Sequence, residues 1–101
     1  MEYKIKISET FLEQITFILE YIDNELNEFN ASNKIRKKLK ESFNRISNFP
    51  RSYPAIEKKD RSNRTYRKIT IYNYVILYTI IEEDNIIFIS NIYYQKRDYL
   101  S

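Results

Sequence analysis

With 101 residues, 43% of them hydrophobic, the chain is long enough for one compact domain that spans residues 1–101. It has no cysteine, histidine or glycine, which excludes disulfides, thiol nucleophiles, histidine proton shuttles and glycine-rich phosphate loops and leaves carboxylates as the side chains available to a metal. The net charge is only +3, but the acids gather in residues 8–33 and the bases in residues 34–68.

The first predicted element is a short strand at the N-terminus. Tyr3, Ile5 and Ile7 alternate with charged residues, which is the period of a half-buried strand. The segment has neither the basic start nor the long apolar stretch of a signal peptide, and no later apolar run reaches the about 20 residues of a membrane span. We therefore expect a cytoplasmic protein with no membrane partner.

Two amphipathic helices are predicted next. Ser8 is placed to cap the first helix, and the asparagine-rich residues 27–33 separate it from the second, for which Asn30 is the predicted cap. The second helix must stop by Pro50, whose ring disfavours helical geometry in the residue before it. The short link predicts an antiparallel hairpin. Its apolar faces are Phe11, Ile15, Ile18 and Ile22 on the first helix and Ile35, Leu39, Phe43, Ile46 and Phe49 on the second.

A long basic loop over residues 49–63 follows, and we expect Phe49 and Tyr53 to anchor it to the core. Three strands are then predicted, at 65–71, 72–82 and 85–94, and their short connections favour antiparallel pairing. The order β-α-α-β-β-β predicts an α+β fold in which the helical hairpin packs on a mostly antiparallel four-stranded sheet.

The basic residues of the middle of the chain have two interpretations. A clustered basic region is typical of a surface that binds nucleic acid or an acidic protein, whereas charged runs on small helices are usually solvated faces. We expect the bases of residues 34–45 to form a solvated helix face. For the bases of the loop we expect contact with a partner or target, and the residues concerned are Arg51, Lys58, Lys59, Arg61 and Arg64.

Several local motifs, in this order, resemble the RelE/ParE superfamily of type II toxin–antitoxin toxins, and the resemblance covers essentially the whole chain. The motifs are the opening strand that ends in Ser8 at a helix start, the Phe-Pro-x-x-Tyr-Pro loop at residues 49–54, Arg67 at the opening of a strand, the Tyr74-x-x-x-Tyr78 strand, and the Lys-Arg-Asp-Tyr ending at residues 96–99. The resemblance implies an antitoxin partner and growth arrest as the output. It also implies one of two targets, because RelE-like members cut messenger RNA in the ribosomal A site and ParE-like members poison DNA gyrase.

The resemblance also suggests which residues to consider if the chain is a nuclease. Metal-free RNA cleavage needs a group that takes a proton from the 2′-hydroxyl, a cation on the phosphate and an acid for the leaving oxygen. RelE-like nucleases commonly carry a key arginine at the position that matches Val75 here, and an apolar residue cannot replace it. The remaining candidates are Arg67, Lys68, Lys96, Arg97 and Tyr99.

We therefore predict a ParE-like toxin, a plasmid-stabilisation type of protein that inhibits DNA gyrase. The alternative is a metal-independent, ribosome-dependent endoribonuclease, and a third interpretation is an inactive relative that only binds the antitoxin. No cofactor and no metal are predicted, because the helical carboxylates do not pair into a site. The apolar residues expected at the sheet border as antitoxin contacts are Ile92, Tyr93 and Tyr94.

Overall fold

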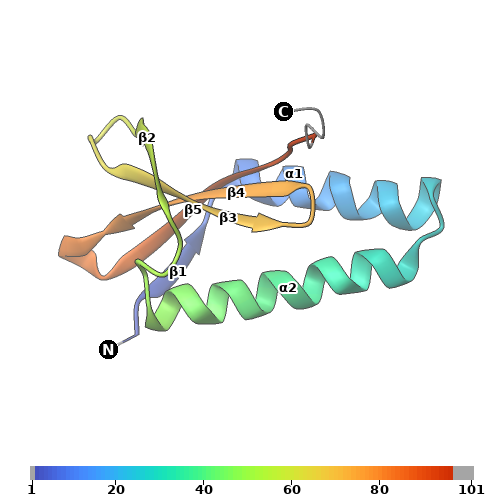
Figure 1. Cartoon of the computed structure of the whole chain (residues 1–101), viewed down its shortest axis with the longest axis horizontal. Coiled ribbons are helices and arrows are strands. Elements are labelled where there is room, and N and C mark those ends of the chain that lie inside the picture. The colour runs from blue at the N-terminus through green and yellow to red at the C-terminus, as the bar shows by residue number, and fades with distance from the viewer. Residues whose placement is uncertain (1, 97–101) are drawn as a thin grey trace.

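The computed structural model describes residues 2–96 and consists of two long helices packed on one sheet (Figure 1). Strand β1 opens the chain, the two helices follow, and the other strands come after them, as the sequence predicted. The elements are β1 (Lys4–Ile7), α1 (Glu9–Glu20), the π-helical turn η1 (Tyr21–Glu25), α2 (Phe29–Asn48), β2 (Ala55–Lys59), β3 (Thr65–Ile71), β4 (Tyr74–Ile81), the 3-10 turn η2 (Glu82–Asp84) and β5 (Ile86–Tyr94).

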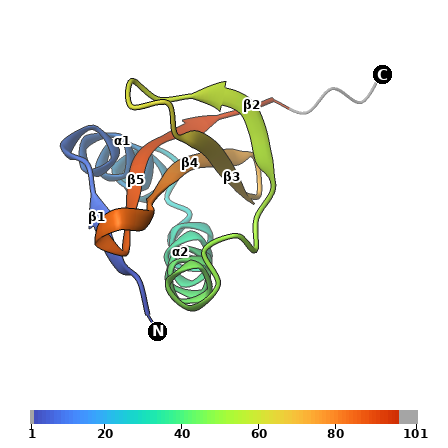
Figure 2. The same ribbon diagram turned by 90° about the vertical axis from the view of Figure 1, so that its left-hand side faces the viewer.

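The sheet is mixed and has the strand order β1-β5-β4-β3-β2. Strand β1 pairs parallel with β5, and the other neighbours are antiparallel. The predicted count of four strands was therefore slightly off: five strands are present, because Ala55–Lys59, expected as loop, pairs with β3. Figure 2 shows the sheet arching over α2, with β2 at its outer edge.

The core lies between the sheet and the helical hairpin. The face of β3 and β4 that points toward the helices presents Ile69, Ile76 and Tyr78, all fully buried, while Ile46 of α2 meets them from the other side. The ring centroids of Phe11 and Phe43 are 6.0 Å apart, so that α1 and α2 also pack on each other. The apolar periodicity of both helices thus predicted the buried faces correctly, except at Phe49, which is 65% exposed rather than an anchor.

The side chain of Ser8 caps α1 and also joins α1 to β5. Its Oγ accepts a hydrogen bond from the Phe11 N–H at 2.9 Å, as an N-cap does, and donates to the Ser90 carbonyl at 2.7 Å. Six residues later, Gln14 Oε1 accepts a hydrogen bond from the Ile92 N–H at 2.8 Å. Beyond the point where β1 ends, the side chains of Ser8 and Gln14 form hydrogen bonds with backbone groups of β5. The predicted cap at Ser8 is therefore confirmed, and Ser8 has a second role in joining α1 to β5.

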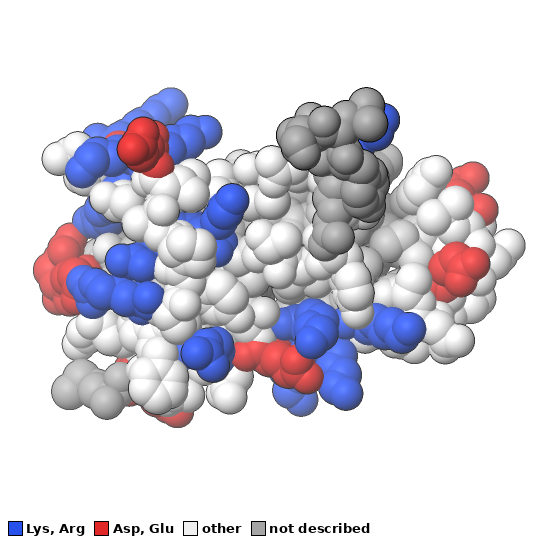
Figure 3. All heavy atoms as spheres, viewed as in Figure 1, with Lys and Arg blue, Asp and Glu red and all other residues white. Residues whose placement is uncertain are grey.

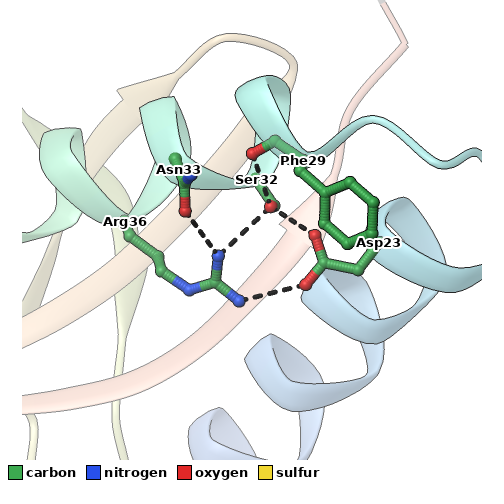
Figure 4. Close-up of polar contacts among 5 residues, drawn as sticks. All are labelled: Asp23, Phe29, Ser32, Asn33 and Arg36. Atoms are coloured by element: carbon green, nitrogen blue, oxygen red, sulfur yellow. Dashed lines mark hydrogen bonds and ion pairs between the residues drawn. The ribbon is translucent and has the colours of Figure 1, made fainter.

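The hairpin junction is held by a polar network (Figure 4). Ser32 is fully buried, donates to an Asp23 carboxylate oxygen and receives a hydrogen bond from Arg36 at 3.1 Å, while Arg36 pairs with Asp23 at 3.2 Å. The hydrogen bond from Ser32 and the nearby guanidinium lower the pKa of the Asp23 carboxyl. Helix α2 begins at Phe29, so Asn30 lies inside the helix and is not its cap; the capping position is Glu28.

Candidate functional site

Two regions of the structure carry the residues that the sequence marked as functional: the loop between α2 and β2, and the face of the sheet that points away from the helices. We call the latter the outer face. Alternation along the strands places Lys68 on it, together with Val75, Leu77 and Thr79 of β4. Arg67 lies on the opposite side, in register with Tyr78.

The loop is fastened to the sheet by Arg67 and Tyr78. Arg67 Nη1 donates to the Tyr53 carbonyl at 2.7 Å and to the Arg51 carbonyl at 3.4 Å, and the Tyr78 hydroxyl donates to the Pro50 carbonyl at 2.7 Å. These bonds satisfy three backbone carbonyls of the loop, and the Lys68 N–H of β3 donates to a fourth, that of Pro54, at 3.1 Å. Arg67, a candidate for phosphate binding, therefore holds the backbone of the Phe-Pro-x-x-Tyr-Pro segment.

Tyr78 is completely buried, and its burial raises the pKa of the phenol to about 12 in spite of the opposing effect of Arg67. A phenol with that pKa remains protonated at neutral pH and acts as a donor. Tyr53 lies half-buried against the core and its hydroxyl is 3.4 Å from Ser42 Oγ, so the expectation that Tyr53 anchors the loop is confirmed. Tyr78 is therefore a core residue that also holds the loop through its hydroxyl.

Of the five loop bases, two are engaged in ion pairs and three are not. Arg51 pairs with Glu82 and Arg64 pairs with Glu83 at 2.6 Å, which fastens the loop and the β2–β3 turn to η2. Within residues 2–96, Lys58, Lys59 and Arg61 form no ion pair. They lie on β2 and the β2–β3 turn, where Figure 3 shows a cluster of basic side chains at the end of the molecule away from the helix junction.

The outer face combines lysines with aromatic rings. Lys58 Nζ lies 6.0 Å from the centre of the Tyr66 ring, and Tyr66 and Lys68 are neighbours two residues apart on the same face of β3. The register of β1 with β5 adds Lys4 and Lys6 beside Phe88, two lysines that the motifs did not single out. The sequence signal for these two lysines was the alternation of apolar and charged residues along β1, which puts Lys4 and Lys6 on the same face.

The centre of the outer face is closed. Val75 is 1% exposed, and Leu77 and Thr79, which follow it on the same face of β4, are also buried. Half-buried Tyr66 and Lys68 flank them on β3, and half-buried Phe88 flanks them on β5. Cations are therefore available at the rim of this face and not at its middle.

The structure separates several residues that the sequence grouped. Arg67 and Lys68 point to opposite faces of β3, so they cannot hold one phosphate together. Tyr93 lies on the outer face opposite Val75, whereas Tyr94 lies on the other face, edge-on to the Tyr74 ring at 5.7 Å. Ile92 was expected to be exposed at the sheet border, but it is 2% exposed and belongs to the core.

The end of the chain is only partly described. Lys96 is exposed just beyond β5, and the candidates Arg97 and Tyr99 lie outside the described residues. In the part of the chain from residue 2 to 96, no three acidic side chains gather into a group that could hold a metal ion. No helix within that part is long and apolar enough to cross a membrane.

Comparison with known proteins agrees with this architecture. The family model described as the ParE toxin of the type II toxin–antitoxin system parDE matches residues 5–99. No curated protein sequence matches the chain significantly.

Several solved structures share the fold. The isolated E. coli RelE toxin is 20% identical and superposes with a TM-score of 0.61 over 97% of this chain and 89% of its own. The E. coli RelBE toxin–antitoxin complex is 17% identical and superposes with a TM-score of 0.62 over 94% of this chain and 99% of its own. The archaeal RelE–RelB complex from Pyrococcus horikoshii OT3 is 16% identical, with a TM-score of 0.53 over 97% of this chain and 100% of its own. At these identities the likeness shows the fold alone.

Proposed function

Because the chain belongs to the ParE toxin family of the RelE/ParE superfamily, we propose that it arrests growth by inhibiting DNA gyrase and that a cognate antitoxin neutralises it. The family match covers residues 5–99, which includes both helices, β1 from its second residue and the whole of β2 to β5. The target surface in this proposal is the basic rim formed by Lys58, Lys59 and Arg61. Arg51 and Arg64 are not part of that rim in the proposal, because each forms an ion pair with an acid of η2 and so holds the loop and the β2–β3 turn in place.

The observation that supports gyrase over RNA is the character of the outer face. At the position where the resemblance implies a key arginine in RNA-cleaving members, this chain has Val75, and Val75 is 1% exposed in the closed centre of the face. A phosphorane needs a cation held directly against it, and lysines at a rim do not supply that position. A protein inhibitor needs no such group, since its binding energy comes from a surface rather than from a proton-transfer residue.

The antitoxin part of the proposal is supported by the family and by its structural relatives. The E. coli and Pyrococcus horikoshii neighbours are named as complexes of toxin with antitoxin. This chain has exposed apolar side chains on the helices and near the end of β5, including Phe17, Tyr21, Tyr93 and Tyr94. Such residues are the surface that a partner segment would cover.

The integrity of the chromosomal DNA in bacteria that express the chain is the measurement that tests this proposal. Poisoned gyrase leaves broken DNA, so pulsed-field gels should show fragmentation within minutes of induction, and co-expression of the antitoxin encoded beside the gene should prevent it. Intact DNA in growth-arrested cells would contradict gyrase as the target. The runner-up function, ribosome-dependent RNA cleavage by Lys68, Lys96, Arg97 or Tyr99, then predicts new messenger RNA ends at A-site codons in primer extension.

A further inference from the structure

A hollow with a volume of about 410 Å³ lies between the second half of α2 and the end of β3. Small-molecule sites in proteins typically have volumes of about 300–1,000 Å³. Three segments line the hollow: one face of α2 that includes Ser42, the loop at Tyr53, and the chain from Thr70 to Tyr72. We call it the Ser42 hollow, and most of the side chains that line it are polar.

The Ser42 hollow contains a pair of hydroxyls that is not fully satisfied. Ser42 is only 7% exposed, and its Oγ accepts a hydrogen bond from the half-buried Tyr53 hydroxyl at 3.4 Å. Two hydroxyls carry two protons, and one hydrogen bond between them uses only one. Among residues 2–96 no acceptor is present for the other proton, whereas the second buried serine of α2, Ser32, donates to Asp23. An acceptor atom bound in the hollow would therefore satisfy a buried donor.

Strand β3 adds a backbone donor to the same hollow. The Lys68 N–H donates to the Pro54 carbonyl at 3.1 Å, so alternate residues of β3 direct their backbone groups away from β4. Thr70 is the next such residue. Ser52, which would continue the pairing, donates its N–H to the Phe49 carbonyl instead. Within the described part of the chain, the Thr70 N–H thus lies at an open strand edge that lines the hollow.

Arg45 supplies the positive charge of the hollow. It lies three residues after Ser42, which puts the two side chains on one face of α2. Arg45 is exposed, and among residues 2–96 it forms no ion pair. Lys38 and Glu41 also line the hollow, but they offset each other because their charged atoms are 3.8 Å apart. The excess charge is therefore that of the Arg45 guanidinium, a group whose geometry fits a phosphate.

An exposed aromatic ring borders the hollow. Tyr72 is 47% exposed, and its φ of 54° lies in the left-handed region, which a Cβ atom disfavours. The other residues with positive φ are asparagines, which tolerate this conformation. Tyr72 is the first residue of the two-residue turn between β3 and β4, a position that usually favours glycine. Strain that presents a large ring beside a polar hollow indicates a role for that ring.

We propose that the Ser42 hollow binds a mononucleotide, a ligand that joins a phosphate monoester to a flat aromatic base. The phosphate oxygens accept hydrogen bonds from the hydroxyl pair of Ser42 and Tyr53, from the Thr70 N–H and from the Arg45 guanidinium. The base stacks on the Tyr72 ring. This site goes beyond the proposed function, because none of the basic rim residues lines it and its test needs neither gyrase nor antitoxin.

Nuclear magnetic resonance of the ¹⁵N-labelled chain, titrated with AMP, adenosine or inorganic phosphate, tests the two halves of the site separately. AMP should shift the amide signals of Thr70 and Tyr72 and should bind at least about tenfold more tightly than adenosine or phosphate, since only AMP fills both halves. Absence of saturable binding of AMP would overturn the proposal. Equal affinity for AMP and phosphate would overturn the contact with the base, and with it the nucleotide.

Three variants locate the binding. Arg45→Ala should weaken AMP at least about tenfold. Tyr72→Gly, in which glycine adopts positive φ without strain, should lower the affinity for AMP to that for phosphate. The matched control Arg61→Ala removes an arginine that forms no ion pair within residues 2–96 and does not line the hollow, and its affinity should stay within twofold of the wild type. Wild-type affinity in either Arg45→Ala or Tyr72→Gly, or signal changes that omit Thr70, would contradict this site.

Discussion

Tyr78→Phe removes the hydroxyl that holds the Phe-Pro-x-x-Tyr-Pro loop to β4 and leaves the rest of the buried ring in place. The lost contact is a 2.7 Å hydrogen bond from a fully buried side chain to the Pro50 carbonyl. A buried acceptor deprived of its donor costs about 1–3 kcal/mol. For a domain of this size that corresponds to a fall in melting temperature of roughly 4–24 °C, at about 4–8 °C per kcal/mol.

The pH dependence of the same variant gives a second, independent number. The folded-state pKa of Tyr78 is raised to about 12 from an ordinary value of 10.0, so the unfolded chain loses this proton first as pH rises. The stability that the protonated phenol contributes is complete below pH 10 and is lost as pH rises through 12. The loss at pH 12 amounts to about 2 kcal/mol, at 1.36 kcal/mol for each pKa unit.

Urea unfolding measures the difference in stability between wild type and Tyr78→Phe at pH 8 and at pH 12. The lysines and the remaining tyrosines titrate equally in both proteins, so their contribution cancels in this difference. We expect the wild type to be more stable by about 2 kcal/mol at pH 8, with the gap close to zero at pH 12. A gap that is the same at both pH values would refute the argument that burial of this phenol raises its pKa. No gap at pH 8 would refute the role of the hydroxyl in holding the loop.

Three further predictions concern the cap, the helix junction and the basic rim. Ser8→Ala should destabilise the fold by about 1–2 kcal/mol in urea unfolding, because one side chain both caps α1 and bonds to β5, while Thr10→Ala, an exposed residue of the same helix, should change it little. The lowered pKa of Asp23 means that its ionised form stabilises the fold fully above the ordinary pKa near 4, and that this contribution decreases as pH falls from there through the lower pKa of the folded state. Asp23→Asn should therefore be less stable than wild type in urea unfolding at pH 7, and the difference should narrow near pH 3. An equal difference at both pH values would contradict the network at the hairpin junction. Lys58→Ala, Lys59→Ala, Arg61→Ala should fold with an unchanged circular dichroism spectrum but need at least tenfold more protein to slow gyrase, whereas Lys37→Ala, Lys40→Ala on the exposed face of α2 should behave as wild type; equal potency of the two sets would remove the rim as the target surface.

Those parts of the fold that depend on nearby residues could be predicted from the sequence. The Ser8 cap needs only a donor three residues away, and the helices repeat their apolar residues within one turn. The start of α2 was misjudged because asparagine is a good cap in general, whereas here the buried Ser32 and its partner Asp23 fix where the helix begins. That contact joins two elements and leaves no local signal.

The additional strand and the exposed Phe49 have the same kind of explanation. Ala55–Lys59 is short and largely polar, and it becomes an edge strand because Arg67 and Tyr78 hold the preceding loop against the sheet. The same loop path leaves Phe49 outside the core. For the candidate site, the sequence indicated which bases matter, but only the pairing with η2 separates Arg51 and Arg64 from Lys58, Lys59 and Arg61.

The most direct test of the central claim is a supercoiling assay with purified DNA gyrase, relaxed plasmid and ATP, titrated with the purified chain in the presence and absence of its antitoxin. We predict that the chain lowers the rate of supercoiling in proportion to its concentration and that equimolar antitoxin restores the rate. Undiminished supercoiling at a large molar excess of the chain, together with A-site cleavage in a translation reaction, would contradict the account and make the protein a nuclease.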